Sequence, residues 1–153
     1  MRLRPYIGVL CLCATLASAK DLALVANKDT SVKSIALPEL VKICKGQTSK
    51  WPDGKLVTFV TRNPASPEMK LVLQKIYAMS ADEVNDLIGA ANHGRVDRPA
   101  VVVLDNDEAV VRKVQSTPGA VGLVDVYSIT GAVAVVKVAG KLPLEPGYAL
   151  HGN

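Results

Sequence analysis

Residues 61–77, TRNPASPEMKLVLQKIY, bring together a cation, a hydroxyl group and the expected start of a helix. Pro67 suits the first turn of a helix, because its missing N–H removes a donor that would lack a partner there, and Ser66 is then the expected N-cap. Free N–H groups at a helix start attract anions, and Arg62 could add a guanidinium fork from the preceding strand. The stretch therefore predicts either a small-anion site, or only a surface arginine followed by a capped turn.

Other kinds of chemistry find little support in the sequence. Cys44 follows the helical spacing of the apolar residues around it, so we expect it to be a small buried hydrophobe. His93 and His151 lie beside glycine in loop-like sequence, and His93 is expected to be an exposed cap residue. The acidic run from Asp105 to Glu108 could suggest a cation site, but a helix cap explains the same residues. We expect no enzymatic activity, no cofactor and no metal.

The elements that must position these residues follow from the apolar pattern. Ser80 with Glu83 forms a capping-box pattern at a helix start, and Asp105 with Glu108 repeats it. Five apolar runs alternate with four helical segments, and most runs are too apolar for a sheet exposed on one face, which predicts one α/β domain. Trp51 should pack beside the turn at Gly54. The residues expected to be buried on strands are Val57, Phe59, Val101, Val103, Val121 and Val135.

The first 19 residues have the features of a secretory signal peptide. Two arginines are followed by an apolar run and by Ala-Ser-Ala before Lys20. We expect a mature domain over residues 20–153 and a periplasmic or secreted location. No later apolar run is long enough to span a membrane, and a lipid anchor at Cys11 or Cys13 is the less favoured alternative.

The charge balance argues against a nucleic-acid partner. The chain has 18 basic and 14 acidic residues, and two of the basic residues lie in the expected signal peptide. The mature chain then has 16 basic and 14 acidic residues, a net charge of +2. No cluster of Lys and Arg with interleaved aromatic residues is present. Partners must therefore be inferred from individual sites.

The order of several motifs resembles the substrate-binding proteins of bacterial phosphate ABC importers. The matching features are a strand ending at Asn27, a helix over 37–46, the WPDG turn at Trp51 and a strand leading to Arg62. STPGAVGLVDV from Ser116 and the closing segment VVKVAGKLPLEPGYAL resemble later parts of the same family. The resemblance implies a single three-layer lobe of the type II periplasmic binding protein kind, in which a mixed sheet has helices on both faces.

The resemblance also implies a site. In that family the arginine at the strand end is followed, at the same interval, by Ser-Gly-Thr at a helix start, and these groups bind phosphate. Arg62 and Ser66 match, whereas Pro67 and Glu68 replace the glycine and the threonine. Glu68 would bring a carboxylate next to the anion, so we expect a weakened or altered site formed by Arg62, Ser66 and Glu68.

Two functions are compatible with this resemblance. The first is an exported module that binds phosphate or a similar small oxyanion weakly, for which an envelope or ABC transporter protein is the expected partner. The chain is about half as long as the two-lobed members of the family, and their glycine- and serine-rich N-terminal loop has no counterpart before Asp21. The alternative is therefore a non-catalytic accessory protein of the cell envelope that keeps the fold without tight ligand binding.

Overall fold

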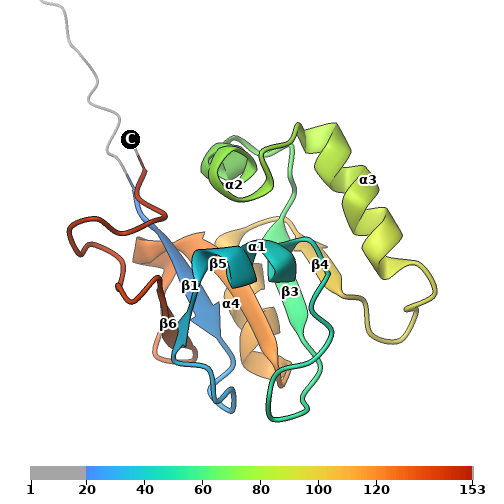
Figure 1. The fold of residues 1–153 in the computed structure, drawn as a ribbon, viewed down its shortest axis with the longest axis horizontal. Helices are drawn as coiled ribbons and strands as arrows, with labels where there is room; N and C mark the ends of the chain where they lie inside the picture. Colours follow the sequence, from blue (N-terminus) through green and yellow to red (C-terminus); the bar gives the residue numbers. More distant parts are fainter. Residues whose placement is uncertain (1–19, 153) are drawn as a thin grey trace, which may run out of the picture.

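The structure is a computed structural model that describes residues 20–152. The expected signal peptide, residues 1–19, lies outside the described residues, so its cleavage stays a prediction. The described residues form a mixed six-stranded sheet with strand order β2-β6-β1-β5-β3-β4 (Figure 1). The strands are β1 (Leu22–Ala26), β2 (Ser34–Ile35), β3 (Thr58–Arg62), β4 (Val101–Leu104), β5 (Ala120–Asp125) and β6 (Ala134–Val138).

The pairing of the strands determines which side chains meet. β3 pairs in parallel with β4 and β5, while β1 pairs antiparallel with β5 and β6. In this register Arg62, the last residue of β3, lies opposite Leu104, the last residue of β4. Because β4 leads after a short turn into the next helix, Arg62 comes close to the start of that helix.

Helices cover both faces of the sheet, as the resemblance implies. The regular helices are α1 (Leu37–Cys44), α3 (Ala81–Asn92) and α4 (Asp107–Ser116). A 3-10 turn (Pro67–Met69), α2 (Lys70–Val72) and a π-helical turn (Leu73–Tyr77) follow one another without a break, and we call this run the 67–77 helix. A further 3-10 turn spans Val126–Ser128.

Alternation along the strands separates two apolar cores. α1, the 67–77 helix and α3 pack with Phe59 and Leu24 on one face of the sheet. α4 packs with Val25 and Val60 on the other face. Figure 1 shows α1 in front of the sheet and α4 behind it. The strands in the middle of the sheet are therefore buried on both faces, which explains why their sequences are apolar throughout.

The burial predictions are mostly confirmed. Phe59, Val101 and Val121 are buried on strands, and Val57 is buried immediately before β3. The prediction is wrong for Val103, which is 39% exposed. Val103 lies on β4, which has a neighbouring strand on one side only, so its carboxyl end has less cover.

Val135 and Trp51 refine the picture of the core. Val135 lies on β6 as expected but is only partly buried. Trp51 is buried and accepts a backbone hydrogen bond from Gly54 at 2.9 Å, which closes the predicted turn. Its ring nitrogen Nε1 donates to the Gly119 carbonyl at 2.8 Å, so the ring ties this turn to the start of β5.

The helix starts agree with the sequence in one case and differ in another. The Ser80 hydroxyl accepts from the Glu83 N–H at 3.2 Å, and the Glu83 carboxylate accepts from the Ser80 N–H at 2.9 Å, so the capping box is confirmed. The cap of α4 is not Asp105 but Asn106, whose Oδ1 accepts from the Ala109 N–H at 2.8 Å. The predicted cap is therefore one residue early.

The two ends of the described chain lie next to each other. The Leu22 N–H donates to the Leu150 carbonyl at 3.1 Å. The Asp21 carboxylate is buried, accepts from the Leu144 N–H at 2.7 Å and contacts His151 Nδ1 at 2.6 Å. These contacts hold residues 144–151 against the start of β1.

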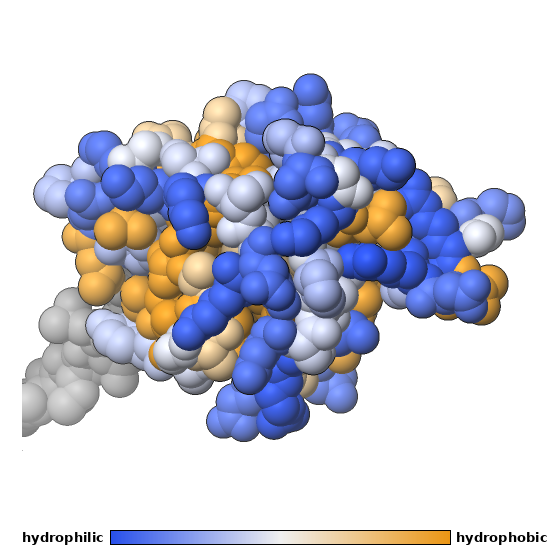
Figure 2. All heavy atoms as spheres, turned by 90° about the horizontal axis from the view of Figure 1, so that it is seen from below, coloured by the Kyte–Doolittle hydropathy of each residue, from blue (hydrophilic) through white to orange (hydrophobic). Residues whose placement is uncertain are grey.

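The outer surface of the molecule is mixed in character. Figure 2 shows the end opposite the 67–77 helix, where hydrophilic side chains cover the centre and apolar atoms gather on either side.

Within residues 20–152, no helix has the length and apolar character needed to cross a membrane. The same residues contain no group of three or more His, Cys, Asp or Glu side chains that could hold a metal ion.

Candidate functional site

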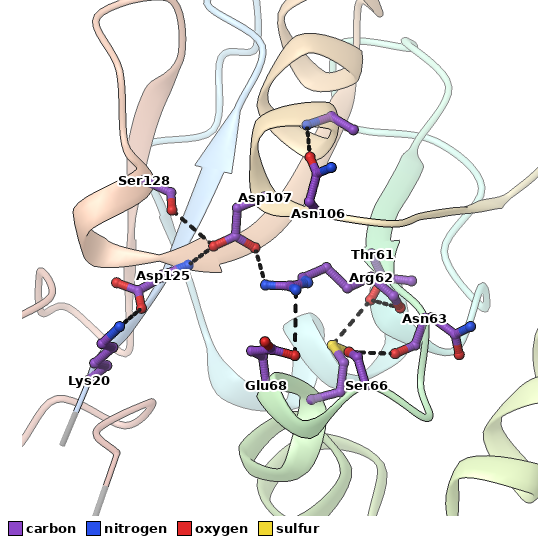
Figure 3. A network of polar contacts seen from close by, with 12 residues as sticks. Lys20, Thr61, Arg62, Asn63, Ser66, Glu68, Asn106, Asp107, Asp125 and Ser128 are labelled. Carbon is purple, nitrogen blue, oxygen red and sulfur yellow. Dashed lines mark hydrogen bonds and ion pairs between the residues drawn. The ribbon is translucent and has the colours of Figure 1, made fainter. Parts of the chain in front are cut away.

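Arg62 is the centre of the candidate site, and it is not a surface arginine. Its side chain is only 17% exposed, and it points between α4 and the 67–77 helix (Figure 3). Nη1 donates to Asp107 Oδ1 at 3.2 Å, and Nη2 lies 3.4 Å from Glu68 Oε2. Nε is buried and has no hydrogen-bond partner among the described residues. The structure thus places one cation between two carboxylates.

Asp107 was not identified as a site residue from the sequence. It is the first residue of α4, and its side chain is 12% exposed. While Oδ1 accepts from Arg62, Oδ2 accepts from the Asp125 N–H and from the Ser128 hydroxyl, both at 3.0 Å. A carboxylate that accepts several hydrogen bonds is held rigidly in one orientation. Asp107 therefore joins the ends of β3 and β5 to the start of α4.

Ser66 occupies the expected position but its hydroxyl has another partner. It donates to the Asn63 carbonyl at 2.8 Å, and the Ser66 N–H donates to the same carbonyl at 2.9 Å. No side-chain capping bond to the following helix is formed, so that part of the prediction is wrong. The hydroxyl instead closes the turn that follows β3, and Pro67, lacking an N–H, offers it no donor.

A cavity of about 370 Å³ opens beside Arg62 and Glu68. Leu22 and Leu123 contribute to its apolar lining, and its further cations are Lys20, Lys70 and Lys75. Arg62 and Glu68, two of the three predicted site residues, line this cavity together, whereas Ser66 is not part of its wall. At this opening Asp107 holds the Arg62 guanidinium in place, and the Glu68 carboxylate lies beside it.

The charges around the cavity are largely compensated. Lys20 pairs with Asp125 at 3.4 Å, and Lys75 donates to the His151 carbonyl at 3.0 Å. Arg62 faces both Asp107 and Glu68. A guanidinium fork suits a carboxylate or a phosphate, but the neighbouring carboxylates reduce the local positive potential. The arrangement can hold a small anion, with less attraction than an uncompensated arginine would provide.

Cys44 and His93 take the roles expected for them. Cys44 is fully buried, and desolvation raises the pKa of its thiol, which keeps it protonated and unreactive. His93 is exposed at the end of α3. The Tyr77 hydroxyl donates to the Cys44 carbonyl at 2.7 Å, so this region stabilises the core.

Comparisons with known proteins identify the fold. No family model matches the sequence, and no curated protein matches it. An ABC-type phosphate transport receptor from Vibrio cholerae superposes with a TM-score of 0.70 at 18% identity, covering 88% of this chain and 54% of that chain.

Two further solved structures agree with this match. PstS from Borrelia burgdorferi gives a TM-score of 0.68 at 16% identity, covering 88% of this chain and 55% of that one. A phosphate-binding protein from Stenotrophomonas maltophilia gives 0.64 at 16% identity, covering 82% and 40%. The chain spans about half the length of these proteins. It therefore has the α/β fold of the substrate-binding proteins of phosphate ABC transporters, in a single lobe.

Proposed function

We propose that this chain is an exported, periplasmic binding module that takes phosphate or a similar small oxyanion weakly. The observation that carries the proposal is the guanidinium of Arg62, held by Asp107 at the wall of a cavity of about 370 Å³. The fold supports it, because solved structures with this fold are named as phosphate-binding or phosphate-transport proteins. On this proposal Arg62 binds the anion, Glu68 lies beside it at the cavity wall, and Ser66 closes the turn that leads into the 67–77 helix.

Weak binding follows from the charges. Two like charges about 4 Å apart repel by roughly 4 kcal/mol at an effective dielectric constant near 20. Glu68 Oε2 lies 3.4 Å from Arg62 Nη2, so an anion that binds Arg62 would come within this range of the Glu68 carboxylate. A charge-assisted hydrogen bond contributes about 1.5–3 kcal/mol, so the repulsion is large enough to cancel one such contact.

The alternative function is an accessory protein of the envelope that uses the fold without a small ligand. The observation in its favour is that Arg62 already faces two carboxylates and the Ser66 hydroxyl already has a partner. In that case Arg62 serves the fold alone. An ABC transporter component or another envelope protein would then be its partner.

Titration calorimetry of the mature protein with phosphate, sulfate and acetate, at low and at moderate salt, separates the two functions. We expect phosphate binding that weakens with salt and is lost in Arg62→Gln. The matched control is Arg112→Gln, which removes an exposed arginine of α4 that does not line the cavity. Circular dichroism confirms that each variant is folded. Absence of binding for all three anions would reject the binding module in favour of the accessory protein.

A further inference from the structure

The two carboxylates that face Arg62 are held in different ways. Asp107 is 12% exposed and has three donors, so it cannot leave its position without breaking the junction between β5 and α4. Glu68 is 55% exposed and lies in the first turn of the 67–77 helix. Among residues 20–152 its side chain makes no other ion pair or hydrogen bond. One carboxylate is therefore fixed and the other is free to turn away.

The edges of the guanidinium are also used differently. Nη1 donates a hydrogen bond to Asp107. Nε–H and one N–H of Nη2 point in the same direction and form the edge that suits the two oxygens of an oxyanion. On that edge Glu68 approaches Nη2 with one oxygen at 3.4 Å, and Nε has no partner. The edge is thus only half used.

We propose that Glu68 is a displaceable internal ligand of Arg62, so that the site is inhibited by its own carboxylate. This inference rests on the proposed anion-binding function and adds its regulation. An incoming group with two oxygens, such as phosphate or a carboxylate, takes the Nε and Nη2 edge while Glu68 turns toward solvent. The pair between Arg62 and Asp107 remains intact throughout, and because Nε is buried in the structure, Glu68 must uncover this edge as it leaves.

The energetics permit this exchange. An ion pair with a half-exposed partner contributes little to stability, so turning Glu68 outward costs little. Phosphate binds only the molecules in which the edge is free, so the apparent affinity is the intrinsic affinity multiplied by that fraction. Repulsion from the nearby carboxylate lowers the affinity further. Removing the charge of Glu68 relieves both effects. The affinity for phosphate should therefore increase while the fold is unchanged.

The test compares phosphate binding by the parent protein, Glu68→Gln and Glu39→Gln. Glu39 is an exposed glutamate of α1 that does not line this cavity, so Glu39→Gln makes the same charge change elsewhere. We expect Glu68→Gln to bind phosphate at least tenfold more tightly and Glu39→Gln to stay within about twofold of the parent, tenfold being about 1.4 kcal/mol. The NMR signal of the Arg62 Nε–H group, assigned with Arg62→Lys, should shift when phosphate is added.

The outcomes distinguish this inference from the function on which it rests. If the parent binds phosphate and Glu68→Gln binds it with the same affinity, Glu68 is no competitor, although the binding function stands. Tighter binding without a shift of the Arg62 signal would place the anion elsewhere and overturn the inference. If neither protein binds phosphate, both the inference and the proposed function are rejected.

Discussion

Replacing Asp107 by alanine tests whether one carboxylate holds the candidate site together. The change removes the acceptor of three hydrogen bonds, from Arg62 Nη1, the Asp125 N–H and the Ser128 hydroxyl, and leaves a mostly buried guanidinium without its fixed partner. Hydrogen bonds to charged groups contribute about 1.5–3 kcal/mol each, but their losses overlap and solvent recovers part of them. We expect the free energy of unfolding to fall by about 3 kcal/mol.

A double-mutant cycle isolates the contribution of the ion pair. At 3.2 Å and an effective dielectric constant near 20, Coulomb's law gives about 5 kcal/mol for unit charges, and desolvation offsets most of it. Arg62→Met keeps the apolar stem and should cost about 1–2 kcal/mol. The double variant with Asp107→Ala should be more stable than the sum of the single changes predicts, by about 1–2 kcal/mol.

Urea denaturation followed by circular dichroism measures these differences. Asp105→Ala is the matched control, since Asp105 is an exposed acid two residues earlier and does not cap α4. It should change stability by less than about 0.5 kcal/mol. The reasoning is refuted if Asp107→Ala costs no more than Asp105→Ala, or if the cycle shows no coupling between Asp107 and Arg62.

Three further predictions concern the fold and its processing. Gly119→Ala should destabilise the protein by more than about 2 kcal/mol in urea, because φ is +81° and a Cβ would lie 2.2 Å from a carbonyl oxygen, whereas Gly131→Ala should be nearly neutral. Burial raises the pKa values of the Cys44 thiol and the Tyr77 hydroxyl, so the folded state keeps protons that the unfolded chain releases above about pH 8.5. The free energy of unfolding should therefore fall as pH rises beyond that value, less steeply in Cys44→Ala, and a flat profile to about pH 10 would contradict this. Intact-mass measurement of exported protein should find Lys20 as its first residue, and an acylated N-terminus further upstream would contradict the cleavage prediction.

The elements that local patterns specify were predictable from the sequence. Apolar runs predicted most of the strands. The capping box at Ser80 and Glu83 was predictable because its two residues are only three positions apart. β2 was not predicted, since two residues in a polar segment become a strand only through their pairing with β6. The alternation of strands and helices also did not reveal that β1 pairs antiparallel with both of its neighbours.

The candidate site shows the same limit more sharply. The proximity of Arg62 and Glu68 follows from a short turn, and it was expected. The pair between Arg62 and Asp107 joins positions 45 residues apart and depends on β3 and β4 lying in parallel register. Acidic residues are common in the first turn of a helix because they interact favourably with the helix dipole. The residues around Asp107 therefore gave no sign that this acid also binds Arg62. The Ser66 hydroxyl could either accept from a helix N–H or donate to the Asn63 carbonyl, and the sequence alone did not decide between these two partners.

The contact between the two ends of the described chain has a practical consequence for protein engineering. Lys20 and Gly152 both line the cavity beside Arg62, and a Cβ on Gly152 would lie 2.3 Å from the Lys20 carbonyl oxygen. Any peptide fused before Lys20 or after Gly152 therefore leaves the domain at the rim of the candidate site. A polyhistidine tag there would add imidazoles next to Arg62, so ligand measurements should use tag-free protein. The same proximity makes the domain suited to circular permutation, in which a short linker joins the ends and new termini open in a distant loop.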